Sequence, residues 1–267
     1  MDESTQRQKS RLLYDVLNQQ GYSSARIKYR SEAASEFFPQ LIKIMDVHFK
    51  PSEVIVAGSC GEGLCKVSAG DVDMMLIPYD VMCVDERSHE NGQTSLTLQT
   101  EYTSTSPGYV RLYTDRDVTN DPMVPFLVSK WCAKTDQYYL NCQLSNSEFK
   151  NTIAQTLPAE YSGPSVSYFP QGYKTACALL NKSLKIKNDN VLALPFFSAT
   201  FLEKWLKRER HHEWPSRELQ REISMMEGYV VPVGHKKSEH SDNEWRISYT
   251  TAEKKLVSNM NDVQVKV

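Results

Sequence analysis

The sequence contains no run of about 18 apolar residues, so it predicts no membrane-spanning helix and no membrane partner. Its first ten residues, MDESTQRQKS, hold no apolar segment of the kind that secretory signal peptides need. The six cysteines form no C-x-x-C pair and no closely spaced framework, which favours reduced thiols over a disulfide-stapled secreted domain. We therefore expect a soluble cytoplasmic protein, with the nucleus as an alternative compartment.

The chain also lacks an excess of basic charge. Its 31 Lys and Arg residues are balanced by 33 Asp and Glu residues, which gives a formal net charge of −2. No overall basic field therefore draws the protein to nucleic acid, although a local basic patch remains open. The absence of repeats, low-complexity tracts and long linkers predicts no division of the 267 residues into independent units.

Strands and helices are mixed along the chain, which predicts an α+β, or mixed α/β, fold. Helices are expected at 3–19, 31–45, 145–157, 199–210 and 217–227 and from Thr251, with Ser31 and Ser216 as N-caps and Gly228 as a helix end. Strands are expected at 54–57, 71–78, 107–112, 166–169, 184–195, 229–233 and 245–249. Residues 80–106 read as polar and turn-rich, and 158–164 as a helix break.

The chain is organised around residues 54–78, VIVAGSCGEGLCKVSAGDVDMMLIP. This stretch reads as a strand, a turn with Gly58 and Ser59, and a second strand that carries Asp71 and Asp73. Side chains alternate faces along a strand, so the two carboxylates share one side, where a hard cation such as magnesium would neutralise them. The Gly-Ser turn can bring backbone N–H groups close to phosphate oxygens. The alternative for the two acids is a solvated strand edge.

A two-metal phosphoryl-transfer site needs a further oxygen ligand, because it clamps both the attacking and the leaving oxygen. Asp189 is the candidate, since it lies in the strand pattern that leads into the apolar run ending at Pro195. Together with the Gly-Ser turn, this third carboxylate favours metal binding over a solvated edge.

Five motifs resemble the Mab-twenty-one (male-abnormal) family, which includes cyclic GMP-AMP synthase and the cyclic GMP-AMP synthase-like receptors. They are GSCGEGL followed by DVD, then DNVLAL from Asp189, WPS at 214–216, VPVG at 231–234, and WRISY at 245–249 continuing to AEK. Their order and spacing match, and the similarity runs from about Ser31 to the C-terminus.

This resemblance implies a nucleotidyltransferase palm with a twisted mixed sheet, residues 51–267, on which N-terminal helices in residues 1–50 pack. It implies Mg²⁺ or Mn²⁺ held by Asp71, Asp73 and Asp189, of which Asp189 can also accept a ribose hydroxyl proton. It further implies a pocket for ATP or GTP formed by Gly58, Ser59, Glu62, Arg246, Ser248, Thr250 and Glu253. Two alternatives stay open: a salt bridge from Arg246 to Glu244 or Glu253, and a purely structural role for Glu62 in the loop.

The sequence departs from the family after the last motif. Family members continue into a helical lobe of more than about a hundred residues, the size of a small domain, and that lobe is expected to be missing here. The synthase's zinc-bearing thumb would follow Glu253 and Lys254, but no Cys or His comes after them. We therefore expect no zinc, and DNA is not an expected partner; double-stranded RNA or another polyanion remains one.

Three interpretations compete. The first is an enzyme that joins ATP and GTP into a cyclic dinucleotide, as an innate immune sensor of nucleic acid. The second is a catalytically silent nucleotide-binding or scaffold protein, and the third is an inactive truncated product. The three carboxylates favour the first, and the shortened C-terminus favours the others.

Overall fold

The structure is a computed structural model that describes residues 3–44, 53–65, 71–78, 81–85, 96–114, 142–143, 159–162, 165–168, 188–198, 200–210 and 214–266. The helix expected at 145–157 lies outside these residues, as does the first part of the strand expected at 184–195. No helix in the described part of the chain is long and apolar enough to cross a membrane.

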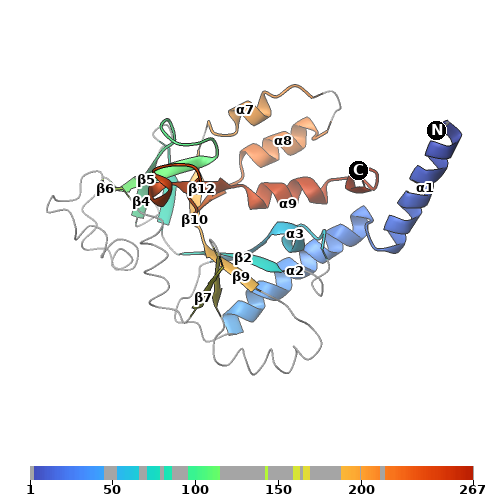
Figure 1. Ribbon diagram of the computed structural model, residues 1–267, viewed down its shortest axis with the longest axis horizontal. Coiled ribbons are helices and arrows are strands. Elements are labelled where there is room, and N and C mark those ends of the chain that lie inside the picture. Colours follow the sequence, from blue (N-terminus) through green and yellow to red (C-terminus); the bar gives the residue numbers. More distant parts are fainter. Residues whose placement is uncertain are drawn as a thin grey trace.

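Two helices open the chain, α1 (Glu3–Gln19) and α2 (Ser24–Ile44) (Figure 1). α2 buries Ile27, Ala34 and Phe38, which recur at helical spacing along the face that packs on β1. The predicted N-cap of this helix is wrong: α2 begins at Ser24, and Ser31 lies inside it. The Ser31 hydroxyl is buried and donates instead to the backbone oxygen of Gly61 at 2.5 Å.

The first sheet has five strands in the order β1 (Glu53–Ala57), β2 (Val72–Ile77), β9 (Asn188–Leu192), β8 (Ser165–Tyr168) and β7 (Ala159–Ser162). β1 and β2 are antiparallel, as expected for the central stretch. β9 joins the other side of β2 in parallel. β7 lies within 158–164, where a helix break is expected, and four of these residues extend the sheet through β8.

The second sheet runs in the order β12 (Trp245–Ser248), β11 (Gly228–Val231), β10 (Leu194–Phe197), β3 (Val81–Val84), β4 (Leu96–Glu101), β5 (Tyr109–Thr114) and β6 (Cys142–Gln143). β12 also pairs with β5, so six of these strands close into a ring. β3 and β4 overturn the expectation that 80–106 is turn-rich throughout.

Short helices complete the described structure: α3 (Gly58–Gly61), α7 (Glu203–Leu206), α8 (Arg217–Ser224), α9 (Thr250–Ser258) and the 3₁₀ turns Ser241–Asn243 and Gln264–Lys266. The N-cap at Ser216 is confirmed, since its hydroxyl accepts from the Leu219 N–H at 3.2 Å. Gly228 begins β11 and does not end the helix. The helix expected at 199–210 is a single turn, α7.

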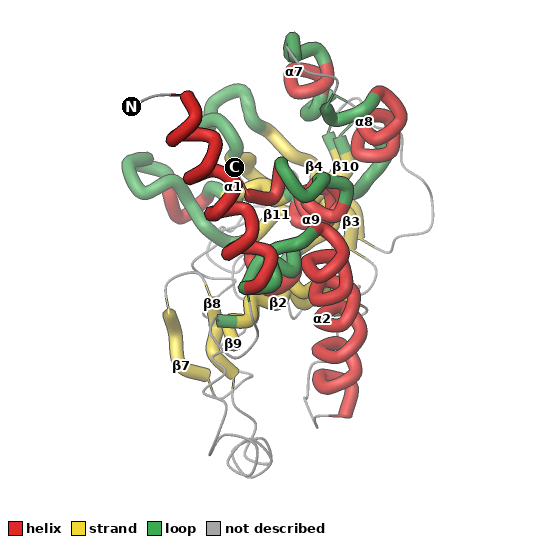
Figure 2. Tube along the Cα trace, turned by 90° about the vertical axis from the view of Figure 1, so that its right-hand side faces the viewer, coloured by secondary structure: helices red, strands yellow, loops and turns green. Residues whose placement is uncertain are grey.

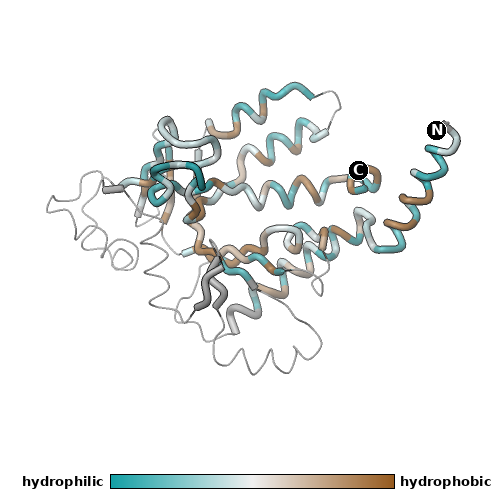
Figure 3. The backbone as a smooth tube through the Cα atoms, in the orientation of Figure 1, coloured by the Kyte–Doolittle hydropathy of each residue, from teal (hydrophilic) through white to brown (hydrophobic). Residues whose placement is uncertain are grey.

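Both faces of the β1–β2 hairpin carry buried apolar clusters. Val56, Val72 and Met74 pack with Ala34 and Phe38 of α2 on one face. A second cluster on the other face joins the two sheets; it consists of Ile55, Ala57, Met75, Ile77, Ala193, Tyr229 and Val231. Figure 2 shows α2 running beside β2, and Figure 3 shows apolar positions, in brown, along the central strands.

The chain passes from one sheet to the other at Ala193, the single residue between β9 and β10. Ala193 is fully buried, and its N–H donates to the Leu76 carbonyl at 3.0 Å. The strand that carries Asp189 is thereby connected directly to the second sheet.

Candidate active site

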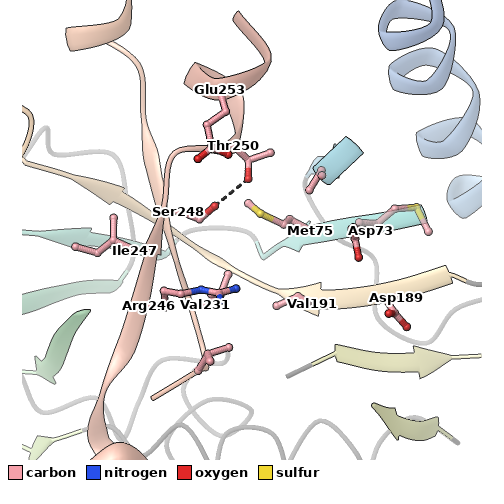
Figure 4. A pocket seen from close by; sticks show the side chains of 14 residues that line it. Asp73, Met75, Asp189, Val191, Val231, Arg246, Ile247, Ser248, Thr250 and Glu253 are labelled. Carbon is pink, nitrogen blue, oxygen red and sulfur yellow. Dashed lines mark hydrogen bonds between the residues drawn. The ribbon is translucent and has the colours of Figure 1, made fainter. Parts of the chain in front are cut away.

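A cleft of about 600 Å³ opens between the two sheets. One wall comes from the β1, β2 and β9 side and the other from β11, β12 and the start of α9 (Figure 4). The polar groups that line it are Gly58, Asp73, Asp189, Arg246, Ser248, Thr250 and Glu253. The structure therefore brings seven of the ten predicted site residues to one cavity, from segments almost 200 positions apart.

Asp73 and Asp189 face each other across neighbouring strands. They are register partners in the parallel β2–β9 pair, and both line the cleft. Partial burial raises the pKa of Asp73 above its ordinary value, and the charges of Asp189 and then Asp71 raise it further. These carboxylates therefore repel one another as they stand, which is the arrangement that a bound cation relieves.

Gly58 lies directly beside Asp73, at the start of α3. Its φ of +58° is a left-handed conformation that glycine adopts freely. A Cβ on Gly58 would lie 2.5 Å from Asp73 Oδ2, so any side chain would collide with the carboxylate. The glycine that the sequence assigned to a phosphate-binding turn thus also gives the Asp73 carboxylate its space.

The opposite wall is built where β12 runs into α9. Arg246 and Ser248 lie on β12, and the Ser248 and Thr250 hydroxyls are hydrogen-bonded at 2.8 Å. Arg246 is exposed toward the cleft. Glu244, in contrast to Arg246, is buried. Its carboxylate accepts hydrogen bonds from the His235 N–H at 3.0 Å and the Ser238 hydroxyl at 2.8 Å. A pairing of Arg246 with Glu253 stays open, since both line the cleft.

Three predicted residues lie outside the lining. Asp71 is exposed and precedes β2, although it is close enough to raise the pKa of Asp73. Ser59 is exposed, and its carbonyl accepts the N–H groups of Leu64 at 2.9 Å and Cys65 at 3.0 Å. Partial burial raises the pKa of Glu62, nearby Glu253 raises it further and Lys254 lowers it.

The chain resembles one known protein family over most of its length. The model of the Mab-21 protein nucleotidyltransferase domain matches residues 80–259, which is more than half of the chain. The chain belongs to the Mab-21 nucleotidyltransferase family. A comparison with curated proteins finds no match.

The range matched to the Mab-21 domain contains five of the seven predicted residues that line the cleft. Asp189, Arg246, Ser248, Thr250 and Glu253 lie within residues 80–259. The hairpin with Gly58 and Asp73 precedes that range, and β-sheet pairing joins it to the matched part: Asp73 is the register partner of Asp189. The family resemblance expected from the sequence is thus confirmed, and the roles of single residues remain predictions.

Sequence reasoning missed two features of the Mab-21 cleft. The first is its apolar floor, made by Met75, Val191, Val231 and Val233. Strand alternation carried this signal, because Met75 and Val191 follow Asp73 and Asp189 by two residues and so share their face. The second is Lys254, which lies behind the cleft and is not among its lining residues.

The Lys254 ammonium joins α9 to α2 behind the cleft. It donates to the Ser35 hydroxyl at 2.7 Å, and burial lowers its pKa while Cys60, Glu53 and Glu62 oppose that shift. Its aliphatic part also approaches Gly61 of α3, because a Cβ on Gly61 would lie 3.7 Å from the Lys254 Cδ. Lys254 therefore contacts both the helix that covers the first sheet and the loop that carries Gly58.

The carboxylates in and beside the cleft are the type of ligand that a hard cation binds. Asp73, Asp189 and the neighbouring Asp71 offer only carboxylate oxygens, the ligands that Mg²⁺ and Mn²⁺ prefer. Within the described residues, no group of three or more His, Cys, Asp or Glu side chains is arranged to hold a metal ion. These carboxylates therefore suit such an ion, because they are oxygen ligands and because a cation would relieve their mutual repulsion. Among the described residues they do not already form a closed set of metal ligands.

Proposed function

We propose that this Mab-21 protein is a metal-dependent nucleotidyltransferase of the cyclic GMP-AMP synthase-like type, which joins ATP and GTP into a cyclic dinucleotide. One observation carries the proposal: Asp73 and Asp189 are in register on adjacent parallel strands and line the same cleft as Arg246 and the Ser248–Thr250 pair. Acidic and basic groups on opposite walls of one cavity suit a triphosphate with its cation.

In this proposal Asp71, Asp73 and Asp189 hold Mg²⁺ or Mn²⁺. The ions supply neutralisation of the charge that develops on the phosphate oxygens. Asp189 accepts the proton of the attacking ribose hydroxyl, a role open to a carboxylate within hydrogen-bond reach. Arg246 binds phosphate or a base edge through its fork of donors, and the apolar floor around Met75 and Val191 excludes water from the base.

A second candidate is a nucleotide-binding protein without catalysis. It is favoured by the position of Asp71, which is exposed and outside the cleft lining, and by the absence of a preformed metal cage in the described residues. Binding of ATP or GTP needs Arg246 and the cleft, whereas transfer needs the carboxylates as well. The two candidates therefore separate in a single set of variants.

The test incubates the purified chain with ATP, GTP and Mg²⁺ or Mn²⁺, with and without double-stranded RNA or DNA, and identifies products by chromatography and mass spectrometry. We expect a dinucleotide from the wild-type chain and none from Asp73→Asn or Asp189→Asn. The matched control is Glu222→Gln, a carboxylate-to-amide change at an exposed salt bridge with Lys255 (2.7 Å). Nucleotide binding without product in every condition would select the second candidate. Absence of binding would refute both.

A further inference from the structure

Two cysteines lie in the loop that carries Gly58. Cys60 belongs to α3, and Cys65 closes the turn that follows, since its N–H donates to the Ser59 carbonyl at 3.0 Å. The Gly63 N–H also donates to the Cys60 carbonyl at 3.1 Å. The chain between the two cysteines therefore folds back on itself and returns Cys65 to the residue before Cys60.

The two side chains meet in the same apolar cluster. Cys60 is only 2% exposed and packs with Val56, Val72 and Met74, and the half-buried Cys65 packs against that cluster. Both thiols are free, and the Cys65 thiol is close enough to Cys60 to raise its pKa. Burial, followed by the neighbouring Cys65, raises the pKa of Cys60 to about 12, so Cys60 stays protonated.

The two thiols differ in access. Cys65 is partly open to solvent and Cys60 is not, so an oxidant reaches Cys65 first. Cys83 offers an internal comparison, because it is free, fully buried in β3 and shielded from any soluble reagent. Apolar packing alone explains a buried cysteine such as Cys83. It does not require a second, partly exposed thiol packed against the same cluster.

We propose that Cys60 and Cys65 form a reversible oxidation site, which closes to a disulfide when the protein meets a hydroperoxide. With hydrogen peroxide, the Cys65 sulfur attacks one peroxide oxygen, an S–O bond forms, the O–O bond breaks and water leaves. The Cys60 thiol, protonated at rest, loses its proton as its sulfur displaces the hydroxyl group from the Cys65 sulfenic acid, and the proton and the hydroxyl group leave as a second water. Two thiols and one peroxide thus give one disulfide and two waters.

Closure of this disulfide would displace the site loop, a consequence that rests on the proposed function. The two free thiols must come to covalent distance, and Cys60 shares the single turn of α3 with Gly58. Gly58 lies close to Asp73, since a Cβ on it would be 2.5 Å from Asp73 Oδ2, and the Gly61 carbonyl accepts a hydrogen bond from the buried Ser31 hydroxyl. Any shift of α3 therefore changes how Gly58 meets Asp73.

The deciding measurement is peptide mapping of the wild-type chain after treatment with hydrogen peroxide, under non-reducing conditions. We expect a Cys60–Cys65 disulfide that dithiothreitol reverses, with Cys83 unmodified. Cys65→Ser, a change at a partly exposed position, should remove the disulfide and leave Cys60 unoxidised. Over-oxidation of Cys65 without a disulfide, or pairing of either residue with another cysteine, would overturn the proposal.

The effect on the site is measured separately. If the dinucleotide synthesis proposed above is observed, oxidation should lower its rate about a hundredfold, because a displacement of about 1 Å at reacting groups costs that much. Dithiothreitol should restore the rate, and Cys65→Ser should keep it in peroxide. If no synthesis occurs at all, the proposed function fails while peptide mapping still decides the thiol site. A disulfide that forms without changing an observed rate would refute the coupling to the loop.

Discussion

The repulsion between Asp73 and Asp189 predicts that a variant without it folds more stably than the wild-type chain. Neighbouring strands are about 4.8 Å apart, and two unit charges at that distance repel by about 3.5 kcal/mol at an effective dielectric constant of about 20 and by about 0.9 kcal/mol in water. The Asp73 side chain is exposed on the cleft, so solvent screening brings the value to about 1 kcal/mol. Asp73→Asn should therefore raise Tm by about 2–4 °C in the absence of divalent cations.

The stability that Asp73→Asn gains over the wild-type chain depends on pH. The pKa of Asp73 is raised in the folded state, so the folded chain binds a proton at this carboxylate more tightly than the unfolded chain does. The destabilisation caused by charge repulsion therefore exists only while the carboxylate is ionised. The advantage of Asp73→Asn is thus full above the folded pKa and shrinks as the pH falls through it. It disappears below about pH 4, where the unfolded carboxylate is protonated too.

Thermal unfolding with and without Mg²⁺ provides the assay. Magnesium at about a hundredfold excess over its dissociation constant should stabilise the wild-type chain by about 2.7 kcal/mol and leave Asp73→Asn unchanged, which reverses their order. Glu101→Gln is the control of opposite sign. Burial would raise the pKa of Glu101, but hydrogen bonds from Thr103 and Ser104 lower it overall, so removal of this charge should destabilise the fold. The reasoning is refuted if metal-free Asp73→Asn melts at or below the wild-type temperature near neutral pH.

Two further predictions concern the loop beside Asp73. Gly58→Ala should abolish nucleotide binding in a calorimetric titration, because its Cβ would lie 2.5 Å from Asp73 Oδ2. The control is Gly108→Ala, where φ is also positive at +84° but the Cβ would meet open space, and this variant should bind nucleotide normally. Equal losses of binding in both variants would contradict the steric explanation. Ser31→Ala should lower the free energy of unfolding by about 1–3 kcal/mol in urea, since it leaves a buried carbonyl of the loop without its donor. An unchanged urea midpoint for Ser31→Ala would show that water replaces the hydroxyl.

The parts of the fold that follow local rules could be predicted from the sequence. The β1–β2 hairpin is visible in apolar strands on either side of glycines, and the cap at Ser216 in the turn that precedes α8. β3 and β4 were missed because they lie in a largely polar region and pair with each other in parallel. β10, which completes the edge of β3, is distant in the sequence, whereas β5 follows β4 closely and pairs with it antiparallel, Glu101 opposite Arg111.

Two helix predictions failed for the same kind of reason. Ser31 has the chemistry of an N-cap, but its hydroxyl lies inside a longer helix and donates to the carbonyl of Gly61, thirty positions away. Residues 199–210 contain an apolar stripe, yet the Phe201 ring packs on Phe196 and Tyr249 and does not continue a helix. In both places a tertiary contact takes precedence over local propensity.

The candidate site could be predicted where chemistry and spacing coincide. Residue type and strand pattern select Asp73 and Asp189 as metal ligands without knowledge of their register, and a family resemblance selects Arg246 and Ser248; all four line the cleft. Ser59 and Asp71 were placed in the site by the same reasoning but lie outside its lining. Lys254 could not be found, because its environment is created by α2 and α3, which approach α9 only in the folded chain.

Because the chain passes from one sheet to the other at Ala193, two distances in the cleft are held by different kinds of interaction. The distance from Asp73 to Asp189 is locked by the ladder of β2 and β9, so changing it means breaking backbone hydrogen bonds. The distance from these acids to Arg246 crosses from one sheet to the other, where side-chain packing and the Ala193 pivot hold the walls together. A molecule entering the cleft can therefore change the gap between the walls only by repacking the side chains between the sheets, whereas changing the spacing of the two acids breaks the strand ladder.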